Sequence, residues 1–369
     1  MKGREQKISE DNYQKKNRAE LEGYSGVQTF MRITENNITN FNESEYGLLE
    51  QILSPTNLNL AFKRVRSNKG SGGVDKMEVE SLKDYLVKNK ELLIASILDG
   101  KYRPNPVRRV EIPKDNNKKR LLGIPTVVDR VIQQAIMQVL SPIYEKQFSD
   151  NSYGFRPRRS AHQALQQCKA NITAGYKYAV DIDLEKFFDK VNQSKLVEIL
   201  SRTVKDGRVI SLIHKYLNAG VMVGSKFELT KQGVPQGGPL SPLLSNIMLN
   251  ELDKELELRG HRFVRYADDI VIFTKSNRSA NRVLTSIVSF IEQKLQLKVN
   301  KQKTNVARVS RIKFLGYAFY VNRGEGRLRV HPKSIIKMKE QIRVLTSRSN
   351  GWGNVRRKEK LTAFIRGWV

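Results

Sequence analysis

The stretch Phe263-Val-Arg-Tyr-Ala-Asp-Asp-Ile-Val-Ile-Phe-Thr274 places β-favouring apolar runs on both sides of two adjacent aspartates, Asp268 and Asp269. This pattern is typical of a β-hairpin whose turn carries the two acids. A turn allows neighbouring carboxylates to face the same point. Taken alone, an Asp-Asp pair is more often a solvated surface turn than a site, so its interpretation depends on what else the chain brings to this hairpin.

A second group of acids precedes the hairpin, in Asp181-Ile-Asp-Leu-Glu-Lys-Phe-Phe-Asp189. Residues 178–184 alternate as a strand does, and a period of two places Asp181 and Asp183 on one face. If this strand lies beside the hairpin, Asp183 meets the two acids of the turn, and the three supply the oxygen ligands that Mg²⁺ prefers. Two metal ions in such a site can activate a 3′-hydroxyl and stabilise a leaving pyrophosphate.

The chain as a whole is strongly basic. Its 369 residues include 66 Lys plus Arg against 37 Asp plus Glu, a formal net charge of +29. This excess indicates a polyanionic partner, with nucleic acid ahead of an anionic membrane surface. We expect no membrane partner and a cytoplasmic location, because no segment approaches the roughly 18 consecutive apolar residues of a spanning helix and no signal peptide is evident. The single cysteine, Cys168, is expected to be buried and to have no function.

Two basic regions flank the acidic centre. Residues 101–130 contain two basic β-favouring segments, Arg109-Val-Glu-Ile-Pro113 and Arg120-Leu-Leu-Gly-Ile-Pro125, separated by Asp115-Asn-Asn-Lys118. This arrangement predicts a hairpin that could bind an anion, although a merely solvated hairpin fits the pattern equally well. Residues 329–369 form the second basic region, and their pattern is mostly helical.

Other segments carry local structure signals. Residues 1–45 show no sustained periodicity and are interpreted as a flexible N-terminal arm. Apolar residues recur at helical spacing from Leu48 to Val65, until Lys69-Gly-Ser-Gly-Gly-Val-Asp75 breaks the pattern. This loop lacks the P-loop form, so we expect close backbone approach there instead of phosphate binding. Ser241 and Pro242 are interpreted as the N-cap and first residue of a long amphipathic helix.

The acidic motifs belong to a collinear series. In chain order, the accompanying motifs are Arg109-Val-Glu-Ile-Pro-Lys114, Arg120-Leu-Leu-Gly-Ile-Pro-Thr126, Ser152-Tyr-Gly-Phe-Arg-Pro157, Gly233-Val-Pro-Gln-Gly-Gly-Pro-Leu-Ser-Pro-Leu244, Lys298-Val-Asn-Lys-Gln-Lys303 and Phe314-Leu-Gly-Tyr317. Together with the two acidic motifs, this series resembles a bacterial group II intron-encoded reverse transcriptase, or maturase, over about residues 46–369.

The resemblance implies roles for individual residues. The catalytic residues and metal ligands would be Asp183, Asp268 and Asp269, holding two Mg²⁺ ions for which Mn²⁺ could substitute. The residues that bind the incoming dNTP would be Lys114, Arg120, Phe188, Gln236 and Lys303. Those that bind template and primer would be Arg108, Arg109, Arg156, Gly237, Phe314, Leu315 and Gly316. Phe188 would act as the steric gate against the ribose 2′-hydroxyl, with simple core packing as its alternative.

The implied fold is the α+β right-hand polymerase fold, with fingers and a palm of antiparallel sheet and packed helices, followed by the start of a helical thumb. The expected divisions are an arm (1–45), an N-terminal extension with fingers (46–175), a palm (176–330) and a thumb (331–369). Apolar residues still recur at helical spacing up to Val369, so we expect a truncated thumb.

The resemblance leaves more than one function open. The leading one is RNA-directed DNA synthesis on group II intron RNA with a DNA primer and dNTPs. The resemblance also leaves open whether the protein forms a homodimer. The alternatives are a splicing maturase that binds intron RNA with little polymerase activity, and a defence-associated reverse transcriptase. The three acids favour retained catalysis, because a pure RNA-binding protein gains nothing from repelling carboxylates.

Overall fold

The computed structural model describes residues 47–114 and 118–368. The predicted N-terminal arm, the hairpin tip at 115–117 and Val369 therefore lie outside the described residues. The chain forms two compact units, the larger one ending at Arg329 and the smaller one containing the described residues 330–368.

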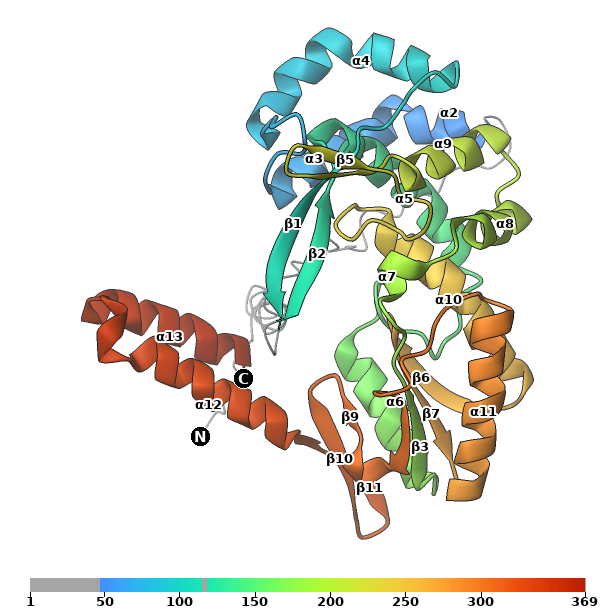
Figure 1. Cartoon of the computed structure of the whole chain (residues 1–369), viewed down its shortest axis with the longest axis vertical. Coiled ribbons are helices and arrows are strands. Elements are labelled where there is room, and N and C mark those ends of the chain that lie inside the picture. Colours follow the sequence, from blue (N-terminus) through green and yellow to red (C-terminus); the bar gives the residue numbers. More distant parts are fainter. Residues whose placement is uncertain (1–46, 115–117, 369) are drawn as a thin grey trace, which may run out of the picture. The chain divides into compact units, whose positions relative to one another are not determined.

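The predicted strand and hairpin form one antiparallel sheet (Figure 1). Its strands, in spatial order, are β6 (Arg262–Tyr266), β7 (Asp269–Thr274), β3 (Tyr178–Ile182) and β8 (Asn305–Arg308). Tyr266 pairs with Asp269 across the turn between β6 and β7, and Ile182 of β3 pairs with Ile270 of β7. The pairing of β3 with β7 on which the sequence argument depended is confirmed.

Both faces of this sheet are buried, which explains why its strands are apolar almost without interruption. One face packs into the main core with α10 (Ser241–Leu258) and α11 (Asn277–Gln293), through side chains that include Val180 and Ile272. The other face packs against α6 (Ala161–Thr173) and the strands β9 (Lys313–Phe314) and β10 (Tyr317–Asn322). Cys168 of α6 is fully buried in this second core, as predicted.

A second sheet contains the predicted basic hairpin. β1 (Val107–Lys114) and β2 (Lys118–Ile124) pair antiparallel, and β1 also pairs in parallel with β4 (Val221–Val223), which continues into β5 (Lys226–Glu228). Ile124 then leads into α5 (Val127–Glu145), which is buried along most of its length. The basic strands are thus attached to the most deeply buried helix of the larger unit.

The helical pattern between Leu48 and Val65 is divided into two helices, α2 (Leu48–Leu53) and α3 (Pro55–Asn68). Pro55 lacks an N–H, and it disfavours helical backbone at Ser54, so the first helix ends there. Ser54 caps the second helix by accepting a bond from the Asn57 backbone N–H at 3.4 Å. The predicted helical spacing is confirmed, and the structure divides it between two helices.

The glycine-rich loop approaches backbone closely, as predicted. A Cβ on Gly73 would lie 2.6 Å from Thr126 Cα, and one on Gly72 would lie 2.7 Å from the Met77 carbonyl oxygen. The Gly72 carbonyl also accepts two bonds from the Arg108 guanidinium, at 3.1 and 2.8 Å. The loop therefore joins β1 to the start of α5.

α10 begins one residue away from its predicted cap. Leu240 occupies the N-cap position and its side chain makes no capping bond. Ser241 is the first helical residue, and its hydroxyl donates to the Pro235 carbonyl instead of capping the helix. The predicted apolar stripe is confirmed, since its members are all buried: Leu243, Leu244, Ile247, Met248, Leu252 and Leu256.

The remaining elements of the larger unit are shorter or more peripheral. They are the 3₁₀ turns η2 (Val79–Ser81) and η3 (Val309–Arg311), the helices α4 (Leu82–Leu98), α7 (Phe187–Lys190), α8 (Gln193–Thr203) and α9 (Gly207–Leu217), and the strand β11 (Glu325–Val330), whose last residue already belongs to the smaller unit. β11 pairs with β10 and so extends the small β9–β10 sheet.

The smaller unit contains the helices α12 (Pro332–Thr346) and α13 (Asn354–Trp368), with the short turn η4 (Arg348–Asn350) between them. α12 and α13 contact each other. α13 has no fully buried residue, and Ile365 of its apolar stripe remains 43% exposed. No helix within the described ranges is both long and apolar enough to span a membrane.

Candidate active site

The three predicted carboxylates lie at the ends of paired strands. Asp183 directly follows Ile182, the residue of β3 that pairs with Ile270, and Asp269 directly precedes Ile270 on β7. Asp268 completes the turn between β6 and β7. Asp269 is exposed, Asp268 is half-buried and the Asp183 side chain is 33% exposed, so all three are accessible from one end of the sheet.

Asp183 is held by the loop that leads into β8. The Asn300 N–H donates to the Asp183 carbonyl at 2.8 Å, and the Asp183 N–H donates to the Thr304 hydroxyl at 3.1 Å. Lys303, between these two residues, places its ammonium 3.0 Å from Asp183 Oδ2. The structure therefore brings Lys303 to the carboxylates.

The acids are crowded enough to affect one another. Burial, and to a smaller extent the negative charge of Asp183 on the same strand face, raise the pKa of Asp181 to about 6. A cation placed near this face would relieve the repulsion. Asp181 was recognised in the sequence as an acid on this face but was given no role there.

The donor chemistry of this site fits a divalent cation, since it offers carboxylate oxygens without sulfur or imidazole. Asp183, Asp268 and Asp269 are the residues that would hold it. Within residues 47–114 and 118–368, no three acidic, histidine or cysteine side chains already lie close enough together to hold a metal ion. The Asp183 carboxylate faces the Lys303 ammonium instead, so one positive charge already partly balances these acids.

The predicted nucleotide side of the site is assembled by the loop between β5 and α10. The Val234 N–H donates to the Phe188 carbonyl at 2.6 Å, and the Gly123 N–H of β2 donates to the Gln236 carbonyl at 2.7 Å. This loop therefore connects the strand that carries Arg120 with the segment that carries Phe188. Arg120 itself is half-buried and pairs with Ile112 across the basic hairpin.

The contact between this loop and β2 requires glycine at position 237. Its φ is +127°, in the region that favours glycine, and a Cβ there would lie 2.6 Å from the Gly123 carbonyl oxygen. Phe188 is half-buried and packs edge-on against Phe187 at 5.2 Å between ring centroids. Its ring is thus supported by the core while part of it stays accessible, so its two predicted interpretations are compatible.

Two residues predicted to bind template or primer are buried. The Arg156 side chain is only 3% exposed, pairs with Glu145 at 2.7 Å and donates to the Ser149 and Ser152 carbonyls. This geometry argues against direct contact with template and gives Arg156 a structural role. Phe314 is likewise buried in the second core, where it supports the turn that follows it.

The other predicted template and primer residues lie nearer the surface. Leu315 and Gly316 form the turn between β9 and β10, both with positive φ, and both are half-buried. Arg108 and Arg109 are half-buried on β1, and Arg108 is occupied by the glycine-rich loop. The side chain of Lys114 lies outside what the structure describes.

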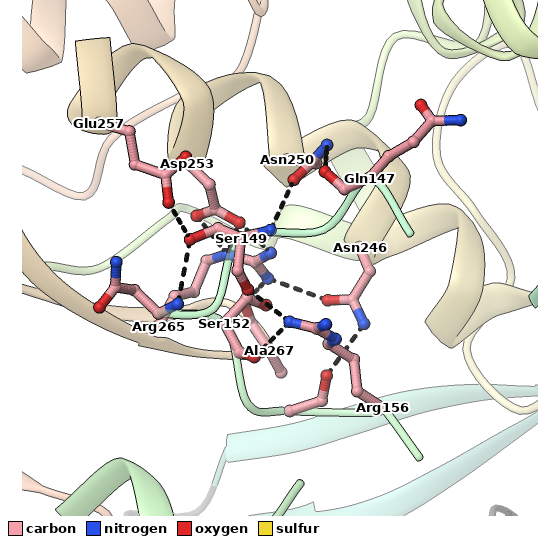
Figure 2. Close-up of polar contacts among 12 residues, drawn as sticks. Gln147, Ser149, Ser152, Arg156, Asn246, Asn250, Asp253, Glu257, Arg265 and Ala267 are labelled. Carbon is pink, nitrogen blue, oxygen red and sulfur yellow. Dashed lines mark hydrogen bonds and ion pairs between the residues drawn. The ribbon is translucent and has the colours of Figure 1, made fainter. Parts of the chain in front are cut away.

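A buried polar network lies behind the turn that carries Asp268 and Asp269, and it was missed in the sequence. Arg265 and Asp253 are both 0% exposed and form an ion pair (Figure 2). The signal was present, because Arg265 is a charged residue inside an apolar strand and a buried charge needs a partner. That partner could not be named, since the acids of α10, the helix directly before this strand, carry no signal that singles out Asp253.

The comparison with known proteins decides the family. A family model for reverse transcriptase (RNA-dependent DNA polymerase) matches residues 112–319. The chain belongs to the reverse transcriptase family. The match begins in β1 and ends in β10, so it contains most of the basic hairpin, the whole antiparallel sheet and the three acids. The reaction of this family is RNA-directed DNA synthesis with divalent metal ions, which confirms the predicted enzyme class.

Two curated relatives narrow the family. Protein YkfC of Escherichia coli (strain K12) is 33% identical over 325 residues, covering 77% of this reverse transcriptase and 85% of that protein. Group II intron-encoded protein LtrA of Lactococcus lactis subsp. cremoris is 32% identical over 360 residues, covering 79% of this chain and 59% of LtrA. The chain thus spans about three fifths of LtrA. These relatives confirm the resemblance to group II intron reverse transcriptases and the α+β polymerase fold.

Proposed function

We propose that this reverse transcriptase copies group II intron RNA into DNA with two Mg²⁺ ions held by Asp183, Asp268 and Asp269. The observation that carries the proposal is the pairing of β3 with β7, which brings Asp183 beside the acidic turn. Two bound Mg²⁺ ions would activate the primer 3′-hydroxyl and stabilise the leaving pyrophosphate. Mn²⁺ has similar oxygen-ligand preferences and is expected to substitute.

The residues around the acids have separate tasks in this proposal. Lys303 neutralises charge next to Asp183 and, once substrate is bound, faces the triphosphate that carries the leaving pyrophosphate. Arg120 and Lys114 of the basic hairpin hold the triphosphate of the incoming dNTP by charge-assisted bonds. Phe188 excludes the 2′-hydroxyl, because its ring is supported by Phe187 and cannot yield easily.

The nucleic acid occupies the surface around this site. Gln236 and Gly237 lie where the loop joins β2, and we assign them to the floor under the templating base pair. Leu315 and Gly316 contact the primer through the β9–β10 turn, which Phe314 supports from the core. Arg108 and Arg109 lie on β1 near the template, although Arg108 is largely occupied by the glycine-rich loop.

Primer extension tests this proposal. The protein is incubated with poly(rA)/oligo(dT) and dTTP, either with Mg²⁺, with Mn²⁺ or with a chelator. We expect extension with either metal ion and none with the chelator. Absence of extension with both metal ions, on protein that binds the template, would contradict the polymerase assignment.

Assistance to splicing is a second function favoured by the similarity to LtrA, a group II intron-encoded protein. The net charge of +29 supplies the electrostatic attraction that binding a structured RNA requires. The measurement is the splicing rate of the intron RNA that flanks the coding sequence, with and without protein. Asp183→Asn should leave this rate unchanged, because RNA binding does not need the metal ligands. An equal rate without protein would exclude the second function.

A further inference from the structure

The turn that carries Asp268 and Asp269 is held from behind by one buried arginine (Figure 2). The guanidinium of Arg265 donates through Nε to Asp253 Oδ1 at 2.8 Å, which fixes its plane. Nη1 of the same group donates to the carbonyl of Ala267 at 2.9 Å. Ala267 directly precedes the two acids, so this bond fixes the backbone from which they project.

Asn246 of α10 connects this arginine to the other side of the turn. Its Oδ1 accepts a bond from Arg265 Nη1 at 2.9 Å, and its Nδ2 donates to the Gly154 carbonyl at 2.9 Å. Gly154 packs directly on the turn, since a Cβ there would lie 2.2 Å from the Ala267 nitrogen. One fully buried amide thus links the two groups that contact Ala267.

The turn needs this support. Ala267 has φ +56°, a conformation that residues with a Cβ adopt rarely, and Asp268 is not among the described residues with positive φ. A two-residue hairpin loop with positive φ only at its first position usually has glycine there. An unsupported alanine would tend to relax out of this conformation, and the two acids would move with it.

We propose that Asn246 is a positioning residue, which acts through Arg265 and Gly154 to hold Ala267 and so aims Asp268 and Asp269 at the reaction centre. This inference rests on the polymerase function proposed above. It predicts that loss of the Asn246 amide affects the rate of the chemical step more than it affects binding of template or dNTP. Small displacements of catalytic groups are sufficient for such an effect.

Asn250 provides a matched control. It lies one helical turn further along α10, is also buried, and bonds to the same chain segment through Gln147 at 3.2 Å and Ser149 at 3.4 Å. Neither of these bonds reaches the catalytic turn. Asn246→Ala and Asn250→Ala therefore remove the same buried group from the same helix, and only the first disturbs Ala267.

The experiment compares both variants with the unmodified protein by thermal melting, by single-turnover dTTP incorporation on poly(rA)/oligo(dT) and by Mn²⁺ binding followed by electron paramagnetic resonance. Both variants should melt at a lower temperature than the unmodified protein. Only Asn246→Ala should lower the incorporation rate, by about tenfold to a hundredfold, with nearly unchanged template affinity and KM for dTTP. Its affinity for Mn²⁺ should also fall.

Equal incorporation rates and equal Mn²⁺ affinities in the two variants would overturn the inference, because the amide would then only stabilise the fold. If Asn246→Ala does not fold, Asn246→Asp takes its place, since it keeps an acceptor for Arg265, loses the donor to Gly154 and adds a negative charge that the Arg265 guanidinium faces. Asn246→Asp should also lower the incorporation rate, by a smaller factor than Asn246→Ala. If the unmodified protein extends no primer, the proposed function fails, and the Mn²⁺ affinities alone then decide on Asn246.

Discussion

At the scale of single residues, Phe188 offers a test that separates specificity from catalysis. Phe188→Ala should raise the use of ribonucleotides relative to deoxyribonucleotides by about tenfold or more, because the ring that blocks the 2′-hydroxyl is removed. The measurement is the ratio of kcat/KM for rTTP and dTTP on the same primer and template.

Phe187→Leu is the matched control for this prediction. Phe187 contacts Phe188 edge-on and is itself buried at 3% exposure. Leucine at this position keeps an apolar side chain beneath the ring of Phe188, so the ring that blocks the 2′-hydroxyl stays in place. The ratio should stay close to that of the unmodified protein in this variant. An unchanged ratio in Phe188→Ala would assign Phe188 to core packing alone.

Asp181 predicts a dependence of stability on pH. The folded-state pKa is about 6, above the ordinary value of 3.8, so above pH 6 the folded chain must keep a charged carboxylate in a half-buried place. As the pH falls from about 6 to about 4, the folded state binds a proton that the unfolded state does not, and this penalty disappears. The penalty at pH 8 amounts to about 3 kcal/mol.

Asp181→Asn should therefore stabilise the metal-free protein at pH 8 and make little difference at pH 4. The measurement is the free energy of unfolding by urea in a chelating buffer across this range. Asp189→Asn, at an exposed position of the same segment, is the control and should leave the profile unchanged. A loss of stability at pH 8 in Asp181→Asn would contradict the burial cost assigned to this carboxyl.

At the scale of elements, the loop between β5 and α10 couples the fingers hairpin to the site. Gly237→Ala places a Cβ against the Gly123 carbonyl oxygen and should break the contact between this loop and β2. We expect KM for dNTP to rise several-fold while template affinity changes little. Gly224→Ala is the control, since its φ is also positive, at +61°, but a Cβ there meets nothing within 4 Å.

Both glycine substitutions introduce a strained residue, which costs about 1 kcal/mol at Gly224. Gly237→Ala should lower thermal stability more, because its φ of +127° suits alanine less and its Cβ meets the Gly123 carbonyl oxygen. The comparison of KM for dNTP is therefore made at a temperature at which both variants are folded. Equal KM values for dNTP in the two variants would mean that the loop does not contribute to nucleotide binding.

Elements with a strong local pattern could be predicted from the sequence. The strands around Ile182 and Ile270 were found because β-favouring apolar residues run through them almost without interruption, and the stripe of α10 because its apolar residues recur at helical spacing. The acidic turn followed from the two runs that flank it. The break at Ser54 was missed although the Ser-Pro signal was present, because the apolar spacing continues across it.

Features whose partners carry no pattern of their own could not be predicted. The resemblance assigned Arg156 to the template, whereas in the structure its side chain bonds to Glu145 and to the Ser149 carbonyl. The parallel pairing of β1 with β4 joins segments far apart in the chain and has no local signature. The support of Ala267 by Asn246 could not be predicted either, because it passes through Arg265 and Gly154 and has no local pattern.

At the scale of the whole molecule, the net charge of +29 predicts binding of RNA that depends steeply on salt. The logarithm of the template affinity should fall linearly with the logarithm of the salt concentration, because counterions are released from the phosphates. Lys333 and Lys339 are exposed on α12. If they bind RNA phosphates, Lys333→Gln with Lys339→Gln should reduce the slope by about 0.7 for each phosphate that is no longer neutralised.

The charge-preserving pair Lys333→Arg with Lys339→Arg is the control and should keep the slope of the unmodified protein. Fluorescence anisotropy with a labelled RNA template, titrated between low and moderate potassium chloride, measures both. A slope unchanged by the glutamine pair would exclude these two lysines from the RNA-binding surface.

The central claim is that Asp183, Asp268 and Asp269 form one metal-dependent centre for DNA synthesis on RNA. The most direct measurement is primer extension by Asp183→Asn, Asp268→Asn and Asp269→Asn, alongside the template affinity of each. We expect each substitution to lower the extension rate by about a thousandfold, since the metal ions contribute several kcal/mol to the reaction. Template affinity should stay nearly unchanged. Extension within about tenfold of the unmodified protein in any one variant would remove that aspartate from the centre and contradict the account.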